Sequence, residues 1–404
     1  MSPSLRILCL NTGSSSLKFA LYELGEHEVA LATGAVEGIG DPDARLSLRK
    51  STDTPAAEVT VEVPDGGAGI QTVLTALDAH QLPAPDAVGH RLVHGGPLYR
   101  APVRVDARVL EALKALVPFA PLHLPAEIGG IEAIARRFPD LPQVVCFDTT
   151  FHRDMPDVAQ HFPLPGALWD AGIRRYGFHG LSYEYVVHAL GAASRGRVVI
   201  AHLGSGASMA AVRDGRSVET TMGFTPTGGL MMGTRPGDLD PGVLLHLLAT
   251  RQYDVEGLTQ LIERGSGLLG VSGLSADVRT LLAARERNPD AALAIAMFCH
   301  RARREVGALA AVLGGLDSLV FTGGIGERSA EIRQEICRGL EHLGVVLDLD
   351  ANRAHAPIVS PRGAACVVRV VETNEDLMVA RHTRAVLQGR AAGTNDRRRE
   401  CKSA

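Results

Sequence analysis

Short apolar runs alternate along the chain with longer stretches in which apolar residues recur at helical spacing. The short runs are typical of strands and the longer stretches of helices. Strands are predicted at Leu5–Leu10, Leu17–Tyr22, Ala87–Val93, Val144–Phe147, Val198–Leu203, Ser318–Phe321 and Val367–Val371. Helices are predicted at Ala107–Leu116, Ala126–Phe138, Ser182–Leu190, Val255–Ile262, Ala291–Leu313 and Ser329–Leu343. The alternation predicts an α/β protein in which some strands form hairpins.

One strand–turn–strand plan occurs twice. Residues 7–21 and residues 199–212 each place small residues between two apolar strands. The second copy continues into Asp214-Gly215, a dipeptide typical of a tight hairpin turn before a third strand. Two copies about half a chain apart predict a duplicated fold whose loops face one cleft. Two unrelated hairpins are the alternative at this point.

Composition excludes several classes of protein. The 404 residues are 46% hydrophobic, which suits two domains with a core each. The formal net charge of -4 provides no basic surplus for nucleic acid or anionic membranes. The six cysteines show no C-x-x-C spacing, and no apolar stretch is long enough to span a bilayer. We therefore expect a cytoplasmic protein that binds neither nucleic acid nor membrane.

Three glycine-rich loops follow predicted strands, at residues 13–18, 202–206 and 322–327. Glycine lets backbone N–H groups approach an anion, and serine hydroxyls add further donors. Lys18, one of only four lysines, lies in the first loop, with Asn11 close by. The P-loop pattern is absent. Each loop alone could be an ordinary turn, but three together favour phosphate binding by another fold.

Charged and histidine residues gather at the ends of other segments. Arg91 follows an apolar strand beside a glycine pair, and Asp148 follows another. His123, His179 and Arg235 lie in short glycine- or proline-containing segments. Each of these alone could be a surface ion pair or a structural histidine. Cations combined with one carboxylate and three glycine loops indicate phosphoryl transfer, which depends on positioning and charge neutralisation.

Ten motifs in order resemble the acetate kinase family, within the wider group of acetate and sugar kinases, actin and chaperone ATPases. The resemblance runs from about Arg6 to Arg381. The motifs are N-T-G-S-S-S-L-K-F, G-H-R-L-V-H-G-G, A-P-L-H, F-D-T-T-F-H, R-R-Y-G-F-H-G, T-M-G-F-T-P, G-L-M-M-G-T-R-P-G-D-L-D-P, S-G-L-L-G-V-S-G, F-T-G-G-I-G-E and T-N-E-D-L-M.

The resemblance implies two duplicated ribonuclease-H-like domains of the actin-like ATPase type, with the nucleotide in an interdomain cleft. An N-terminal domain for acyl substrate and phosphate would cover residues 1–148, joined by a C-terminal helix at about 376–388. A nucleotide-binding domain would cover residues 149–375. The polar and basic residues 389–404 are expected to form a loose tail. Members of the family are homodimers, so a homodimer is expected.

The activity implied is reversible, magnesium-dependent transfer of the γ-phosphoryl group of ATP to acetate, in line, giving acetyl phosphate and ADP. Manganese could replace magnesium. By resemblance, the catalytic residues are Arg91, His123, Asp148, His179 and Arg235. The metal ligands are Asn11 and Glu375, and the acyl pocket comprises Arg91, Val93, Leu122, Phe178 and Pro226. The nucleotide-binding residues are Ser14, Ser16, Lys18, His202, Leu203, Gly204, Ser205, Gly206, Asp277, Val278, Arg279, Gly324, Ile325, Gly326, Glu327 and Arg328.

The chain departs from the family pattern beside these motifs. Ser205 replaces the usual asparagine of the second loop, which leaves the preferred nucleotide open. Further departures are Leu124, Glu127, Leu181, Tyr183, Thr227, Gly228 and Arg328. Two alternatives to an acetate kinase stay open. One is a kinase for propionate or another short acid. The other is an actin-like ATPase switch, which would leave Arg91, His123 and Asp148 unexplained.

Overall fold

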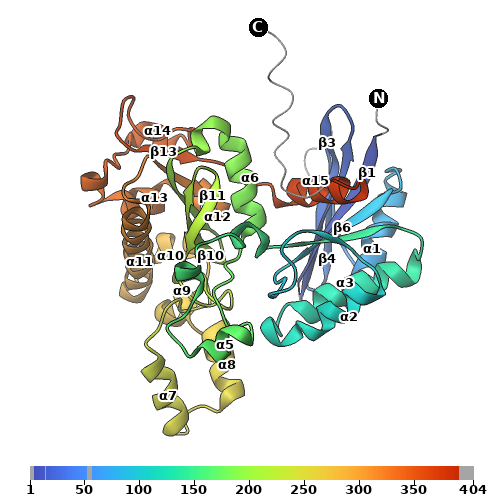
Figure 1. Cartoon of the computed structure of the whole chain (residues 1–404), viewed down its shortest axis with the longest axis horizontal. Coiled ribbons are helices and arrows are strands. Elements are labelled where there is room, and N and C mark those ends of the chain that lie inside the picture. Colours follow the sequence, from blue (N-terminus) through green and yellow to red (C-terminus); the bar gives the residue numbers. More distant parts are fainter. Residues whose placement is uncertain (1–3, 14, 52–56, 391–404) are drawn as a thin grey trace. The chain divides into compact units, whose positions relative to one another are not determined.

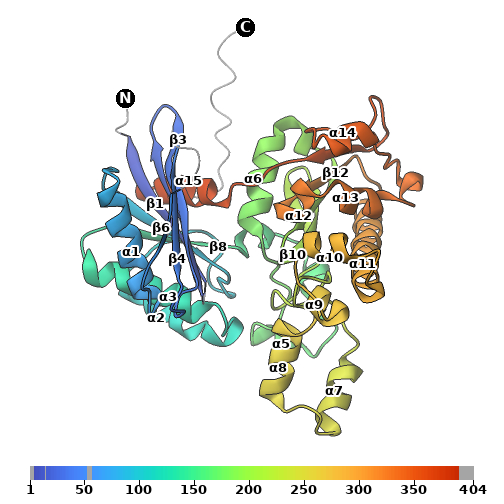
Figure 2. The ribbon, with the colours of Figure 1, turned by 180° about the vertical axis from the view of Figure 1, so that it is seen from behind.

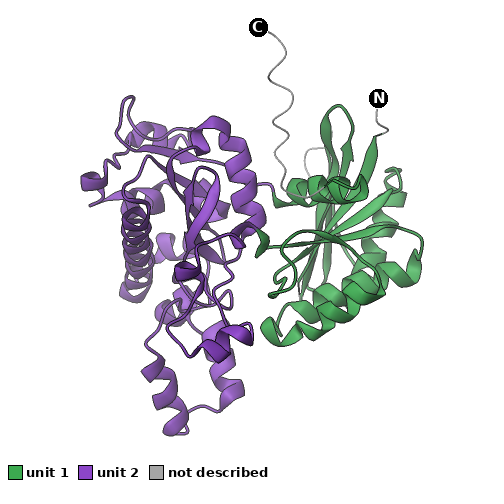
Figure 3. Cartoon of the chain, viewed as in Figure 1, with its two compact units in different colours: residues 1–150, 375–404 green, residues 151–374 purple. Residues whose placement is uncertain are grey.

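The structure, a computed structural model, describes residues 4–13, 15–51 and 57–390 (Figure 1). Ser14 and residues 391–404 of the expected tail lie outside the described residues. The chain divides into two compact units (Figure 3). Unit 1 comprises the residues up to Thr150 together with those from Glu375 onward, and unit 2 comprises Phe151–Asn374. In the described part of the chain, no helix is long and apolar enough to cross a membrane.

Unit 1 is built on a mixed eight-stranded sheet with the order β5-β4-β3-β2-β1-β6-β8-β7. The strands are β1 (Leu5–Thr12), β2 (Ser16–Leu24), β3 (Glu28–Glu37), β4 (Arg45–Lys50), β5 (Ala57–Thr60), β6 (Ala87–Leu92), β7 (Val103–Arg104) and β8 (Gln143–Phe147). Strands β1 to β5 form an antiparallel meander, whereas β6 pairs in parallel with both β1 and β8.

Helices cover both faces of this sheet (Figure 1, Figure 2). They are α1 (Gly66–Ala79), α2 (Ala107–Ala115), α3 (Leu124–Arg137) and α15 (Glu375–Leu387). Leu8 and Leu10 of β1 share one buried cluster with α1 and α3. Cys9, between them, points to the opposite face, where its Sγ lies 3.2 Å from the Asp376 carbonyl of α15. The helix at the end of the chain is therefore part of the first unit's core.

Unit 2 is built on a five-stranded sheet with the order β11-β10-β9-β12-β13. Its strands are β9 (Arg197–Leu203), β10 (Ala207–Arg213), β11 (Arg216–Thr220), β12 (Ser318–Thr322) and β13 (Val367–Val370). Its helices are α4 (Asp157–Gln160), α5 (Gly166–Asp170), α6 (Gly180–Leu190), α7 (Pro241–Ala249), α8 (Val255–Arg264), α9 (Gly267–Ser272), α10 (Val278–Ala284), α11 (Pro289–Leu313), α12 (Gly323–Arg328), α13 (Ala330–Cys337) and α14 (Leu349–Arg353). Tyr183 and Val186 of α6 pack on β9, β10 and β12.

The two sheets contain the same five-stranded core. In each, a three-stranded antiparallel meander is extended by two parallel strands beside its first strand. One ion pair also recurs at similar positions: Arg6, the second residue of β1, binds Asp86, just before β6, while Arg197, the first residue of β9, binds Asp317, just before β12. In both pairs the aspartate also accepts the arginine's backbone N–H, at 2.9 and 2.8 Å. The predicted duplication is confirmed.

One predicted helix is wrong in its length. The helix predicted at Ser329–Leu343 ends as α13 at Cys337, and a separate 3₁₀ turn follows at Glu341–Leu343. Gly339 lies between them with φ of +87°, a left-handed conformation that interrupts the helix. The other predicted strands and helices are confirmed within a few residues at their ends.

Candidate active site

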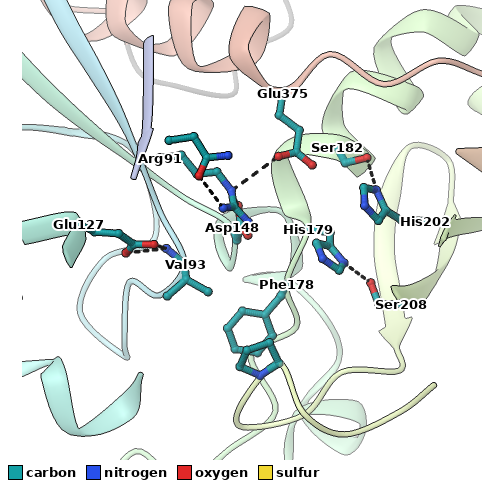
Figure 4. Close-up of polar contacts among 12 residues, drawn as sticks. Arg91, Val93, Glu127, Asp148, Phe178, His179, Ser182, His202, Ser208 and Glu375 are labelled. Atoms are coloured by element: carbon teal, nitrogen blue, oxygen red, sulfur yellow. Dashed lines mark hydrogen bonds and ion pairs between the residues drawn. The ribbon is translucent and has the colours of Figure 1, made fainter. Parts of the chain in front are cut away.

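Arg91 lies at the centre of a polar cluster in unit 1 (Figure 4). It is near the end of β6, beside Asn11 of β1, and Asp148 directly follows β8. Because β1, β6 and β8 run parallel, their carboxyl ends lie at one edge of the sheet, where α/β proteins bind ligands. The Asp148 backbone N–H donates to the Leu92 carbonyl at 3.0 Å, which fixes the position of the carboxylate.

The Arg91 guanidinium is held by three oxygen-bearing side chains. Nε and Nη2 donate to the two oxygens of Asp148, with Nε 3.0 Å from Oδ1, and Nη1 donates to Asn11 Oδ1 at 3.0 Å. Glu375, at the start of α15, places its Oε2 3.6 Å from Arg91 Nε. Burial alone would lower the pKa of Arg91, but Asp148 and Glu375 outweigh it and raise this pKa above the usual value. Arg91 is therefore a permanent cation, still 20% exposed in its side chain.

Asn11 and Glu375 satisfy the chemistry that a magnesium ion requires. Each offers a side-chain oxygen at the same guanidinium, and Mg²⁺ in nucleotide enzymes uses few protein ligands besides water and phosphate oxygens. No group of three or more histidine, cysteine, aspartate or glutamate residues able to hold a metal ion occurs among the described residues. The pair therefore fits a metal carried by the substrate's phosphates and does not form a closed protein cage.

Four further predicted residues belong to unit 1. Lys18 is exposed on β2, directly opposite Asn11 of β1, and Ser16 opens the same strand. His123 lies at the start of α3 and is half-buried, as is Leu122 before it. Lys18 and Ser16 thus lie at the start of β2, and Leu122 and His123 directly precede α3, whereas Ser14 is outside the described residues.

Glu127 is a buried acid that the sequence pattern left without a role. Its two oxygens accept the backbone N–H of Val93 at 3.2 and 3.1 Å, just beyond the end of β6. Burial raises the pKa of Glu127 to about 8, against the attraction of Arg91 and the Val93 hydrogen bond. The carboxyl fixes the backbone of a residue predicted to line the acyl pocket, so it influences the shape of that pocket.

Replacing Glu127 by glutamine is expected to remove a pH dependence of stability. Because the pKa rises from 4.5 in the unfolded chain to about 8 on folding, wild-type stability falls as pH increases between these values. The glutamine side chain keeps an acceptor for the Val93 N–H without titrating, so the variant should gain on the wild type from pH 5 to pH 8. Urea unfolding at several pH values measures the difference. Glu132→Gln, on the same helix, is the control, and parallel curves for Glu127→Gln and the wild type would contradict the prediction.

Unit 2 contains a stacked pair of histidines at the ends of its own elements. His179 precedes α6 with φ of +57°, and His202 lies near the end of β9. Their rings stack with centroids 4.3 Å apart. Nδ1 of His179 lies 2.8 Å from Ser208 Oγ, and Nδ1 of His202 lies 2.8 Å from Ser182 Oγ (Figure 4). Both imidazoles are thus oriented through Nδ1, a pattern that directs Nε2 to the other side of each ring.

Arg235 joins this group at the second glycine loop. A Cβ added to Gly206 would lie 3.4 Å from His179 Nε2 and 3.7 Å from Arg235 Nη1, so both side chains border the loop. Arg235 Nη1 donates to the Pro226 carbonyl at 2.9 Å, and its Nε lies 3.5 Å from Glu263 Oε2. Thr227 also donates to Glu263. The departure at Thr227 therefore belongs to the network that holds Arg235.

The second and third glycine loops are neighbours in unit 2. They follow β9 and β12, which pair in parallel with Thr322 opposite His202. A Cβ on Gly323, whose φ is +74°, would come within 2.8 Å of the Leu203 carbonyl, so only glycine permits this approach. Glu327 accepts the backbone N–H groups of Gly323 at 2.8 Å and Thr373 at 3.1 Å. Its carboxylate therefore organises the loop from within.

The remaining predicted nucleotide residues lie at the start of α10. The Asp277 carboxylate caps this helix and pairs with Arg279, and the hydrogen bond from Arg279 lowers the pKa of Asp277 to about 2. The Arg279 side chain is 91% exposed. Val278 between them is buried. Phe178 is buried beside His179, and its carbonyl accepts from His152 Nε2 at 3.0 Å.

Comparison with solved structures supports the same arrangement of strands and helices. The chain superposes on the crystal structure of Porphyromonas gingivalis acetate kinase with a TM-score of 0.85 at 37% identity, covering 95% of this chain and 100% of the other. For a propionate kinase from Francisella tularensis, the TM-score is 0.88 at 36% identity with the same coverage. Fold and site together define an α/β phosphotransferase built from two related units.

The sequence comparisons are more specific. The chain is 46% identical to the acetate kinase of Rhodopseudomonas palustris over 397 residues, covering 95% of this chain and 98% of the relative. The sequence profile of the Acetokinase family matches residues 6–381. The chain therefore belongs to the acetokinase family, and the predicted resemblance is confirmed.

Proposed function

We propose that this acetokinase transfers the γ-phosphoryl group of ATP to acetate, reversibly, giving acetyl phosphate and ADP. The observation that carries the proposal is Arg91, a permanent cation at the ends of parallel strands, held by Asp148 and Asn11 but still partly exposed. Such a guanidinium can bind a carboxylate and a phosphoryl group through the same planar fork. The family of the chain supplies the reaction, and Arg91 supplies a place for its small acid.

In unit 1, Arg91 would bind the acetate carboxylate and the transferring phosphoryl group. Acetate is already ionised at neutral pH, so no base is needed to activate it. Asp148 would act by orienting Arg91 and the acid, since both of its oxygens are engaged by the guanidinium. His123 would contact the phosphoryl oxygens. Val93 and Leu122 would contact the methyl group.

In unit 2, His179 and Arg235 would neutralise charge on the phosphoryl group in the transition state, where phosphoryl transfer gains most of its rate. Their common approach to Gly206 supports one target for both. Residues 202–206, 277–279 and 324–328 would hold the nucleotide. In unit 1, Lys18, Ser14 and Ser16 would line the phosphate path. Glu327 and Val278 would bind the nucleotide through their backbone groups. The Glu327 carboxylate already accepts two backbone N–H groups, and the Val278 side chain is buried.

Asn11 and Glu375 would bind the magnesium ion, or manganese in its place. The ion supplies charge neutralisation for the β- and γ-phosphate oxygens. Asn11 also accepts a hydrogen bond from the Arg91 guanidinium, and Glu375 lies 3.6 Å from it, so both would serve Arg91 as well as the ion. Asp376 beside them has its pKa raised to about 6 by burial and by Glu375.

A hydroxylamine trap tests the function. Purified protein with ATP, Mg²⁺ and acetate should form acetyl hydroxamate, and the reaction should require all three. A folded protein that hydrolyses ATP without forming hydroxamate would refute the kinase and favour a conformational ATPase. Running the trap with GTP in place of ATP determines which nucleotide the Ser205 loop prefers.

The preference of the enzyme for acids of different chain length is expected to depend on Val93. The similarity to a propionate kinase makes propionate the second candidate. Val93 is 4% exposed, and its backbone is fixed by Glu127, so shortening its side chain should enlarge the pocket rather than move it. Val93→Ala should raise the ratio of propionate to acetate kcat/KM by about 5-fold or more, since one methylene is worth about 1 to 3 kcal/mol. An unchanged ratio would place Val93 outside the pocket.

A homodimer is proposed through helix α7. This helix is apolar yet has no buried residue, and Val243 and Leu245 are 45% and 66% exposed. An exposed apolar helix of this kind indicates a protein interface, and a second copy of the chain is its simplest occupant. Leu245→Glu should convert dimers to monomers in sedimentation velocity. A wild-type monomer at micromolar concentration, or an unaffected dimer in the variant, would contradict this assignment.

A further inference from the structure

Three side chains form a hydrogen-bonded chain inside unit 2 that ends on His179. The hydroxyl of Tyr183 lies 2.5 Å from Ser208 Oγ, and this oxygen lies 2.8 Å from His179 Nδ1. Tyr183 and Ser208 are both fully buried. Their hydroxyls therefore exchange hydrogen bonds within the protein and not with bulk water. Tyr183 is one of the positions at which this chain departs from the family pattern, so the arrangement is a property of this chain.

The other ring nitrogen of His179 faces the second glycine loop. The Gly206 position lies between His179 Nε2 and Arg235 Nη1, as the distances to an added Cβ show. The ring also stacks on His202. A positive charge on His179 would be repelled by the neighbouring guanidinium and by any charge on the stacked ring, which favours the neutral imidazole. A neutral imidazole carries one proton, on either Nδ1 or Nε2.

We infer that Tyr183 and Ser208 are positioning residues that keep the proton of neutral His179 on Nε2. A phenol is a stronger acid than an alkyl hydroxyl, so Tyr183 donates to Ser208 and Ser208 donates to Nδ1. The ring then presents an N–H donor at the loop beside Arg235. This tautomer can stabilise phosphoryl oxygens, whereas the other would direct a lone pair at them. Only this last step rests on the proposed function.

The tautomer can be measured without any activity. The ¹⁵N chemical shifts of the ring nitrogens, in protein labelled at histidine and assigned with His179→Gln, identify the protonated nitrogen. We expect Nε2–H in the wild type. Ser208→Ala removes the donor to Nδ1 and should give a mixture of both tautomers. Nδ1–H in the wild type would overturn the inference, whatever the enzyme does.

Kinetics provide the second readout. Tyr183→Phe should lower kcat about 3- to 10-fold, the loss expected for one neutral hydrogen bond, with KM for acetate and ATP changed by less than about twofold. Tyr183→His should recover most of the loss through its ring N–H. Tyr185→Phe makes the same change two positions along α6, at a half-buried residue, and should leave kcat unaltered.

The outcomes separate the two proposals. A wild type that forms no acyl phosphate refutes the function, while the tautomer measurement still decides the inference. If Tyr183→Phe has the same kcat as the wild type and the same His179 tautomer, Tyr183 is not a positioning residue. If that variant does not fold, the wild-type tautomer and Ser208→Ala decide instead.

Discussion

The Arg91→Ala variant is expected to lose about 10³- to 10⁵-fold in kcat for acetyl phosphate formation, the range that a transition-state arginine supplies in phosphoryl transfer. It should also lose stability. Asp148 is 1% exposed and both its oxygens bind Arg91, so the variant leaves a buried carboxylate without its cation. Breaking such a pair costs about 3–5 kcal/mol. Steady-state kinetics and urea unfolding measure the two effects.

A second substitution separates the two effects of losing Arg91. Adding Asp148→Asn to Arg91→Ala removes the buried charge that Arg91 no longer neutralises, and it should restore much of the stability, but none of the turnover. Arg6→Ala is the matched control, because Arg6 forms the equivalent kind of pair with Asp86 at the other end of the sheet, with side chains 34% exposed. It should keep kcat near the wild-type value. Turnover within tenfold of wild type in Arg91→Ala would remove Arg91 from the reaction.

The Arg235→Ala variant is expected to lose a similar factor in kcat, about 10³-fold or more, with a much smaller change in the KM for acetate. The side chain borders Gly206 together with His179 and also contacts the Pro226 carbonyl, the Met232 sulfur and Glu263. The variant should lose less stability than Arg91→Ala, because Glu263 is 15% exposed and still accepts the Thr227 hydroxyl.

Two further substitutions test whether the loss in Arg235→Ala is specific to the Arg235 side chain. Arg213→Ala removes an arginine of β10 whose guanidinium binds the Leu313 carbonyl at 3.1 Å, and should keep full turnover. Glu263→Gln weakens the hold on Arg235 without removing it and should give an intermediate kcat. A large loss of kcat from Arg213→Ala would assign the effect to folding instead of chemistry. An unchanged kcat in Arg235→Ala would remove Arg235 from the reaction.

The sequence predicted the parts of the fold that local pattern encodes. Apolar runs located β1, β6, β8, β9, β12 and β13, and the glycine loops after them proved to lie at strand ends. Strands β3 and β4 were missed because small and charged residues interrupt their apolar pattern. Gly34 in β3 shows the reason: a Cβ there would lie 2.2 Å from the Ser47 carbonyl and 2.5 Å from the Phe19 ring, so packing selects glycine inside a strand.

The candidate site, like the fold, has residues that the sequence predicts and residues that it does not. Arg91, Asp148, His179 and Arg235 carry their signal in short motifs, which the resemblance could identify. Glu127, Glu263 and Ser208 have no such signal, since their importance comes from contacts with residues distant in the sequence. Glu127 reaches Val93 across 34 positions and Ser208 reaches His179 across 29. Only the folded chain reveals such positioning residues.

The most direct measurement follows a labelled oxygen from acetate into the product. With [¹⁸O₂]acetate, Mg²⁺ and ATP, attack of the carboxylate on the γ-phosphorus should yield ADP and acetyl phosphate with ¹⁸O bonded to phosphorus, visible as an isotope shift in the ³¹P spectrum. Acetyl adenylate with pyrophosphate would place the attack at the α-phosphorus. Inorganic phosphate without acyl phosphate, or acyl phosphate without ¹⁸O on phosphorus, would equally contradict a direct transfer to acetate.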